Sequence, residues 1–151
     1  MPGTYTLKLN VDGRTYTQTA TVRADPRSPA SAAALRAQHA LQMRLTDAIA
    51  LSYEARERAG LIRTSLRGIP TGADLADVAS RATLLLAQLD TVYGLDGGGR
   101  GRGGAAAPNF SGLNGTFVGQ LNAQDLGDMA PTTAALAAFT KACVDLKSVL
   151  V

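Results

Sequence analysis

The first 27 residues constrain the fold more than any other part of this 151-residue chain, because they have the pattern of one β-hairpin. Apolar and polar residues alternate strictly in the first strand, whose apolar face consists of Tyr5, Leu7, Leu9 and Val11. A two-residue turn, Asp12-Gly13, follows, and both of its positions favour a residue that accepts positive φ. The returning strand, residues 14–22, places Tyr16, Ala20 and Val22 on one face.

This hairpin is expected to need a cover, because two strands alone are only marginally stable in water. Three covers fit the pattern: strands of a longer parent protein, strands of another copy of the chain, or the chain's own helices. An exposed strand edge also pairs readily with other strands, and only Lys8 and Arg14 guard this one with charge. The candidate interaction edge consists of Thr4, Tyr5, Thr6, Leu7, Leu9, Tyr16, Thr17 and Thr19.

A long helix is predicted to follow the hairpin. Pro26 and Pro29 end the extended segment, and either Ser28 or Ser31 is the expected N-cap. The helix should run to about Arg67, since apolar residues recur at spacings of three and four. Its apolar stripe consists of Leu41, Leu45, Ile49, Ser52, Ala55, Ala59, Ile62 and Leu66.

Further helices are predicted in the second half of the chain. Gly68 and Pro70 stop the long helix, Thr71 and Asp74 fit a capping box for a second one, and Gly94 closes that second helix. The stripe of the second helix is Leu75, Val78, Ala82, Leu85, Leu86, Leu89 and Val92. A short third helix carries Phe110, Leu113, Phe117 and Leu121, and a last helix, capped by Thr132, carries Leu136, Phe139, Cys143, Leu146 and Leu150.

These elements predict an α+β fold that is mostly α, with an N-terminal β-hairpin followed by an antiparallel three- to four-helix bundle. The expected divisions are the hairpin at 1–27, a long helical hairpin at 28–95, a Gly-rich flexible linker at 96–108 and a helical pair at 109–151.

The residue types that carry chemistry are few. His39 is the one histidine and Cys143 the one cysteine, and neither has a nucleophile or base paired with it by spacing. Cys143 is expected to pack in the core, and one histidine with one cysteine falls short of a zinc site. Asp47, Glu54 and Glu57 are expected on a solvated helix face. The sequence therefore predicts no catalytic residue, no metal and no cofactor.

Asp25 is interpreted as structural. It lies between the hairpin and the first helix, where it can cap the helix start or pair with Arg23 or Arg27. Removal of Asp25, His39 or Asp47 should matter for turnover only if the chain contributes to an active site.

Charge and hydropathy narrow the class of partner. The net charge of +3 is too diffuse for a nucleic-acid surface, and the two arginines among the glycines of 97–104 lack interleaved aromatic residues. No apolar run is long enough to span a membrane. The N-terminus lacks the segments of a signal peptide, so any export signal is expected outside this sequence.

Three segments around the hairpin form a specific combination: Gly-Thr-Tyr-Thr-Leu-Lys-Leu-Asn-Val-Asp-Gly at 3–13, Tyr-Thr-Gln at 16–18 and Val-Arg-Ala-Asp-Pro-Arg at 22–27. This combination resembles the C-terminal tail of bacterial sortilin-like β-propeller proteins, a family often labelled glycosyl hydrolases of the BNR-repeat type. The segment Asp-Met-Ala-Pro-Thr at 128–132 is also similar to that tail. The resemblance implies that the hairpin forms the last two strands of an immunoglobulin-like sandwich and that the parent protein is extracytoplasmic.

The propeller of that family, with any catalytic acids, is absent from this sequence. The first hypothesis is therefore a non-catalytic interaction module that docks onto a propeller or onto itself. The second is a self-assembling subunit that forms a homo-oligomer by pairing through its open hairpin edge. The third is an accessory part of a glycoside hydrolase that completes a neighbour's active site.

Overall fold

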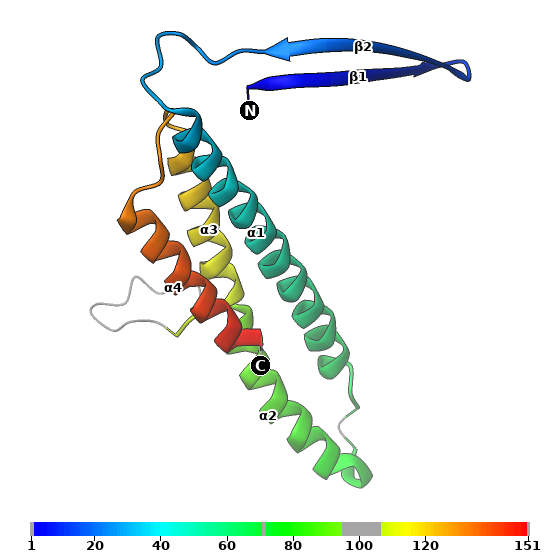
Figure 1. Ribbon diagram of the computed structural model, residues 1–151. Coiled ribbons are helices and arrows are strands. Elements are labelled where there is room, and N and C mark those ends of the chain that lie inside the picture. Colours follow the sequence, from blue (N-terminus) through cyan, green and yellow to red (C-terminus); the bar gives the residue numbers. More distant parts are fainter. Residues whose placement is uncertain (1, 71, 95–106, 151) are drawn as a thin grey trace.

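A computed structural model describes residues 2–70, 72–94 and 107–150, and Figure 1 shows a hairpin joined to a helical bundle. The predicted fold class, α+β and mostly α, is confirmed. In chain order the elements are β1 (Gly3–Val11), β2 (Arg14–Val22), α1 (Ala32–Arg67), a short 3-10 turn η1 (Ala73–Leu75), α2 (Ala76–Tyr93), α3 (Phe110–Gln124) and α4 (Thr133–Leu150).

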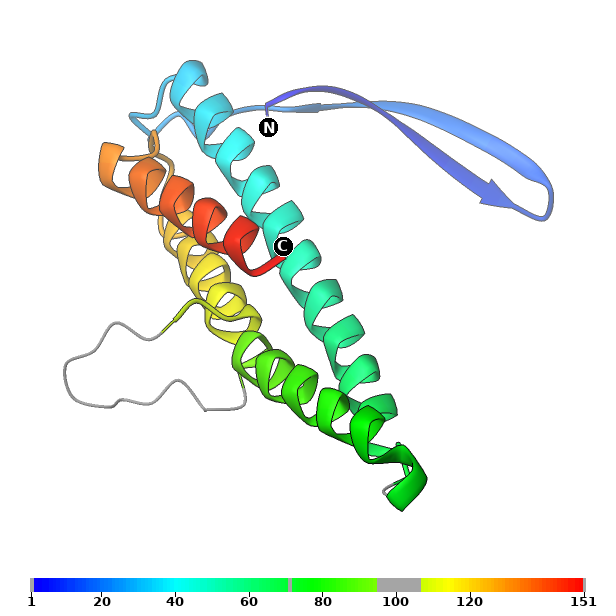
Figure 2. The same ribbon diagram turned by 90° about the horizontal axis from the view of Figure 1, so that it is seen from below.

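The hairpin forms as its sequence predicts. Asp12 and Gly13 have φ of 48° and 75°, so both turn residues are left-handed and the turn matches the twist of the strands. This turn sets Val11 opposite Arg14, and the antiparallel register continues to Gly3 opposite Val22. The two strands form a two-stranded sheet that projects away from the helices in both views (Figures 1 and 2).

Ser31, and not Ser28, is the N-cap of α1. The Ala34 amide donates to the Ser31 hydroxyl over 3.1 Å, which satisfies one of the free amides of the first turn. The Ser28 hydroxyl instead accepts from the Ala30 amide over 3.3 Å, ahead of the helix. The other end of α1 lies at Gly68, as predicted.

Different helices pack along the two halves of α1. Figure 1 shows α3 and α4 along its N-terminal half and α2 along its C-terminal half, with α2 and α3 nearly end to end. Contacts confirm this division, since Asn114 of α3 donates to the Ile49 carbonyl and Asp90 of α2 pairs with Arg63. The bundle is therefore three helices wide near the hairpin and two helices wide at the far end.

The core lies in the three-helix half. Phe117 is fully buried and meets Phe139 edge to face, with ring centroids 6.2 Å apart. The buried apolar residues are Leu41, Leu45, Ala48, Ala59, Phe110, Leu113, Phe117, Phe139, Ala142 and Leu146. Predicted stripe positions of α1, α3 and α4 supply most of this core, which explains why those helices pack together.

The stripe predicted for α2 is buried only in part: Ala82, Leu86, Leu89 and Val92 are half-buried, and no residue of α2 is fully buried. Leu89 and Val92 pack against the core, while Val78 and Leu85 are 48% and 44% exposed. Ile62, predicted on the stripe of α1, is likewise 49% exposed. In the described part of the chain, no third helix lies over this end of the bundle (Figure 1).

The junction between α2 and α3 depends on one glycine. Gly94 has φ of 87° and its amide donates to the Asp90 carbonyl, which closes α2 as predicted. Asn109 then caps α3 by accepting from the Gly112 amide over 2.8 Å. Thr71, the predicted cap of the second helix, and most of the predicted linker lie outside the described residues. Within the described ranges, no helix has the length and apolar character to cross a membrane.

Candidate interaction surface

One side of the hairpin is apolar and uncovered. The large apolar residues of this side are Tyr5, Leu7, Leu9, Val11, Tyr16 and Val22, which are between 42% and 61% exposed, and Arg14 and Gln18 lie on the same side. Ala20, opposite Tyr5, is half-buried, and every other strand residue is exposed. Val22 lies at a pocket that Leu35 and His39 of α1 also line, but the rest of the hairpin projects away from the described helices (Figure 2). Of the three covers that fit the sequence, the helices within residues 32–70, 72–94 and 107–150 do not supply one for most of this side.

The opposite side of the hairpin is polar and built mainly of threonine. Its cross-strand pairs are Thr4–Thr21, Thr6–Thr19, Lys8–Thr17 and Asn10–Thr15. The Thr15 hydroxyl donates to the Asn10 side-chain oxygen over 2.7 Å, which joins the strands next to the turn. β-branched threonines favour extended backbone and hydrogen-bond with water, so this threonine side suits solvent.

The turn also decides which backbone groups point outward. In a hairpin with a two-residue turn, the pair that flanks the turn, here Val11 and Arg14, forms two backbone hydrogen bonds across the strands. Along the hairpin such hydrogen-bonded pairs alternate with pairs whose amides and carbonyls point away from the partner strand. The outward amides and carbonyls therefore belong to the residues of the threonine side. On β2 these are Thr15, Thr17, Thr19 and Thr21, with no charge among them, whereas the outer edge of β1 includes Lys8.

This pattern divides the residues of the candidate interaction edge into two sets. Thr4, Thr6, Thr17 and Thr19 do present outward backbone groups. By contrast, the backbones of Tyr5, Leu7, Leu9 and Tyr16 face the partner strand within the hairpin. The second set belongs to the surface through side chains on the apolar side and not through backbone pairing. The alternation in the sequence predicted which side chains share a face of the hairpin. It did not show which of these residues have backbone amides that point away from the partner strand.

The link from the hairpin to α1 is fixed by Asp25 and Arg27. The Asp25 carboxylate accepts from the Arg27 guanidinium over 2.8 Å and from the Arg27 amide over 2.9 Å. The side-chain bond first, and the amide second, lower the pKa of the Asp25 carboxyl from its ordinary value. Of the two arginines that the sequence offered as partners, Asp25 pairs with Arg27 and not with Arg23.

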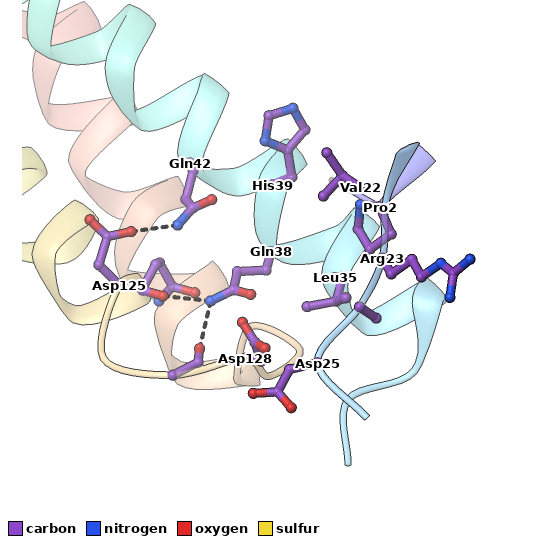
Figure 3. Close-up of a pocket in the computed structure, with 13 residues that line it drawn as sticks. Pro2, Val22, Arg23, Asp25, Leu35, Gln38, His39, Gln42, Asp125 and Asp128 are labelled. Carbon is purple, nitrogen blue, oxygen red and sulfur yellow. Dashed lines mark hydrogen bonds between the residues drawn. The ribbon is translucent and has the colours of Figure 1, made fainter. Parts of the chain in front are cut away.

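A polar pocket of about 370 Å³ lies where this link meets the helices. Figure 3 shows His39 on one side of it and Asp25 and Asp128 on the other. The side chain of Gln38 is buried and donates to the carbonyls of Gln124 and Gly127, so it fastens the α3–α4 turn to α1 (Figure 3). The sequence did not single out Gln38 because it is polar, although it lies three residues before Leu41 and seven before Leu45 and so continues the apolar stripe of α1.

The other chemistry-bearing residues lie apart. Asp47 and the half-buried Cys143 line a second pocket, between α1 and α4, while Glu54 forms an exposed pair with Arg58 and Glu57 is exposed. Within residues 2–70, 72–94 and 107–150, no three His, Cys, Asp or Glu side chains gather as a metal site. The structure brings His39 and Asp25 to one pocket and leaves Asp47 outside it.

A buried ion pair joins α1 to α2, and the sequence did not predict it. The side chain of Arg63 is 7% exposed, and its Nε donates to Asp90 over 2.5 Å. The Tyr93 ring lies between two guanidiniums, 4.3 Å from that of Arg63 and 4.6 Å from that of Arg56. Gly60 allows this ring to approach α1, since a Cβ there would lie 3.3 Å from it.

Comparisons with known proteins found no matching family model, no similar curated protein and no similar solved structure. The resemblance of the hairpin region to sortilin-like tails stays a prediction from the sequence.

Proposed function

We propose that this chain is a non-catalytic protein-interaction module whose hairpin completes a β-sheet supplied by other strands. The observation that carries the proposal is the uncovered apolar side of the hairpin. A two-stranded hairpin becomes independently stable only when further strands or a helix cover its apolar face.

The size of the uncovered side supports this role. Full burial of a leucine side chain contributes about 1.5–3 kcal/mol. Leu7 and Leu9 are 57% and 61% exposed, so burial by a partner would supply more than half of this free energy at each residue. Val11 and Tyr16 add further exposed apolar surface beside them. Contiguous apolar surface of this kind is typical of a surface that binds another protein.

The resemblance described above supports a specific partner class. If the hairpin is the end of an immunoglobulin-like sandwich, the missing strands cover its apolar side and pair with one edge. The partner is then the rest of that sandwich and the propeller beside it, and the helical bundle is an accessory to them.

Amide hydrogen exchange on the full chain tests the proposal, at a concentration where light scattering gives a monomer mass. The inward amides of Leu7 and Gln18 should exchange far faster than amides in the middle of α1, since the lone hairpin is marginal. Protection of Leu7 and Gln18 equal to that of α1 in the monomer would contradict the proposal. A hairpin stable without a cover has no need of a partner.

A second candidate is self-assembly through β2, and the uncharged outer edge of that strand favours it. Native edges are usually guarded by charge or proline, and the β2 residues whose backbone groups point outward, Thr15, Thr17, Thr19 and Thr21, have neither. Mass should then rise over a hundredfold concentration range. Thr19→Pro should abolish the rise, because it removes an outward amide and spares the pairs within the hairpin. Thr6→Pro is the matched control on β1, and a Thr19→Pro chain that still associates would exclude pairing through β2.

A further inference from the structure

Gln18 is the polar residue at the centre of the apolar side of the hairpin. It is the middle residue of β2, it lies opposite Leu7, and its neighbours on the same side are Tyr16 and Ala20. In the proposed function other strands cover this side, and a buried side-chain amide without a hydrogen-bond partner costs about 1–3 kcal/mol. Whatever completes the sheet therefore has to supply a polar partner for Gln18.

The outer edge of β2 is symmetric about Gln18. The outward backbone groups belong to Thr15 and Thr17 before it and to Thr19 and Thr21 after it. Residues 15–21 include no charged residue and no proline, so nothing in this segment guards the edge. In Figure 1, β2 runs along the side of the hairpin that faces away from the bundle, and no described element pairs with its outer edge.

A second copy of β2 matches this edge completely in one antiparallel register. With Gln18 opposite Gln18 of the second copy, Thr17 lies opposite Thr19 and Thr15 lies opposite Thr21, so every outward amide and carbonyl finds a partner. A slide by two residues would place the turn or the link opposite one of the threonines. A slide by one residue would set outward backbone groups against inward ones. Full pairing therefore selects the register that is centred on Gln18.

The side chains that meet in this register fit one another. A glutamine amide has both donors and an acceptor, so the two Gln18 side chains can hydrogen-bond reciprocally. Beside them, the large Tyr16 lies opposite the small Ala20 of the second copy, and on the other side of the sheet threonines lie opposite threonines. Across residues 15–21, no like charges face each other.

We propose that the strand beside β2 belongs to a second copy of this chain, which runs antiparallel to it with a two-fold axis at Gln18. This pairing rests on the proposed function, in which the hairpin completes a β-sheet, and it names the partner at the β2 edge. The product is a continuous sheet in the order β1–β2–β2–β1, which exceeds the three strands that an independently stable sheet needs. Because the strands are antiparallel, the two helical bundles lie at opposite ends of this sheet. A strand of a different protein has no symmetry that brings an amide opposite Gln18.

Cross-linking at Gln18 tests the register. In a non-hydrogen-bonded antiparallel pair the two Cα atoms lie about 4.5 Å apart, within the range of about 4.4–6.8 Å that a disulfide spans. The full chain with Gln18→Cys, and with Cys143→Ala to remove the native thiol, should form a disulfide-linked dimer under mild oxidation. Thr17→Cys and Thr19→Cys are the matched controls, because an offset of two residues sets the two copies of each more than about 7 Å apart. The cross-linked fraction at Gln18 should exceed theirs at least about tenfold.

Charge at the two-fold axis gives a second test that needs no cysteine. Gln18→Lys and Gln18→Glu should each weaken association about three- to tenfold in analytical ultracentrifugation, because the amide pair is lost and like charges lie directly opposite. An equimolar mixture of the two variants should restore association, since opposite charges then meet at the axis. Thr6→Lys is the control, because it places the same charge on β1, and it should leave association unchanged.

Three results would each exclude the pairing at Gln18. The first is a monomer mass over a hundredfold concentration range. The second is equal cross-linking at Thr17 and Gln18, and the third is a Gln18→Lys chain that associates like the unsubstituted chain. Fast exchange of the inward amide of Leu7 in the monomer would leave the proposed function intact, whereas slow exchange there would contradict the proposed function itself. The two failures are therefore distinguishable.

Discussion

Replacement of Asp90 by asparagine should release α2 from the rest of the bundle. Asp90 is the partner of Arg63, whose side chain is 7% exposed, and it also lies 4.0 Å from Arg67. Besides the packing of Leu89 and Val92 against the core, this ion pair and the stacking of Tyr93 join α2 to α1. Asp90→Asn keeps the size of the side chain and removes its charge.

The expected cost follows from the burial of the two partners. Removal of one partner of a fully buried ion pair costs about 3–5 kcal/mol, because the other charge stays buried and unpaired. The Asp90 side chain is 30% exposed, so water reaches it and the cost should be lower, about 2–3 kcal/mol. Since about 1.4 kcal/mol is a factor of ten, local opening of α2 should become roughly 30- to 150-fold more frequent.

Amide hydrogen exchange followed residue by residue is the suitable assay. Amides of α2 should lose protection by that factor, whereas amides around Phe117 in the three-helix half should keep most of theirs. Lys141→Met is a control, since it breaks an exposed ion pair with Asp145 on α4 and should change exchange little.

Unchanged α2 protection in the Asp90→Asn chain would refute this reasoning. An equal loss of protection in all helices would refute the expectation that the opening is confined to α2. The double variant Arg63→Met with Asp90→Leu sharpens the test, because replacement of both charges by apolar groups leaves no unpaired ion. It should recover most of the protection that the single variant loses.

Three other substitutions have defined outcomes. Phe117→Ala should cost about 3–5 kcal/mol in urea denaturation, because Phe117 is fully buried; a loss under about 1 kcal/mol would contradict the placement of the core. Gly94→Ala should cost more than about 1 kcal/mol, since φ is 87° and the new Cβ would collide with Asn109; an unchanged melting temperature would refute this. Arg27→Ala should raise the pKa of Asp25 toward its ordinary 3.8 in an NMR titration. Because the pKa of Asp25 is lowered in the folded chain, the pair stabilises the link above pH 3.8 and loses its effect as the pH falls through the folded-state pKa. A pKa of Asp25 that is the same in the Arg27→Ala chain would contradict the pairing.

Local sequence signals determined the elements of this protein. Strict alternation and the Asp12-Gly13 turn specified the hairpin, because side-chain direction in a strand and positive φ in a turn are local properties. Ser31, Gly94 and Asn109 mark helix ends for the same reason, although the sequence left Ser28 and Ser31 as alternatives and did not single out Asn109. The predicted fold class followed from these signals alone.

The interaction surfaces depended on tertiary structure. Apolar stripes on α1 and α2 show which side of each helix can be buried, but burial requires a neighbour along the whole stripe. Because α4 reaches only half of α1, identical patterns became core at Leu45 and open surface at Ile62. The same holds for Arg63 and Asp90, which lie 27 residues apart and meet only after α2 folds back. The sequence by itself thus determined what each segment can form, and packing alone decided which apolar faces stay free for a partner.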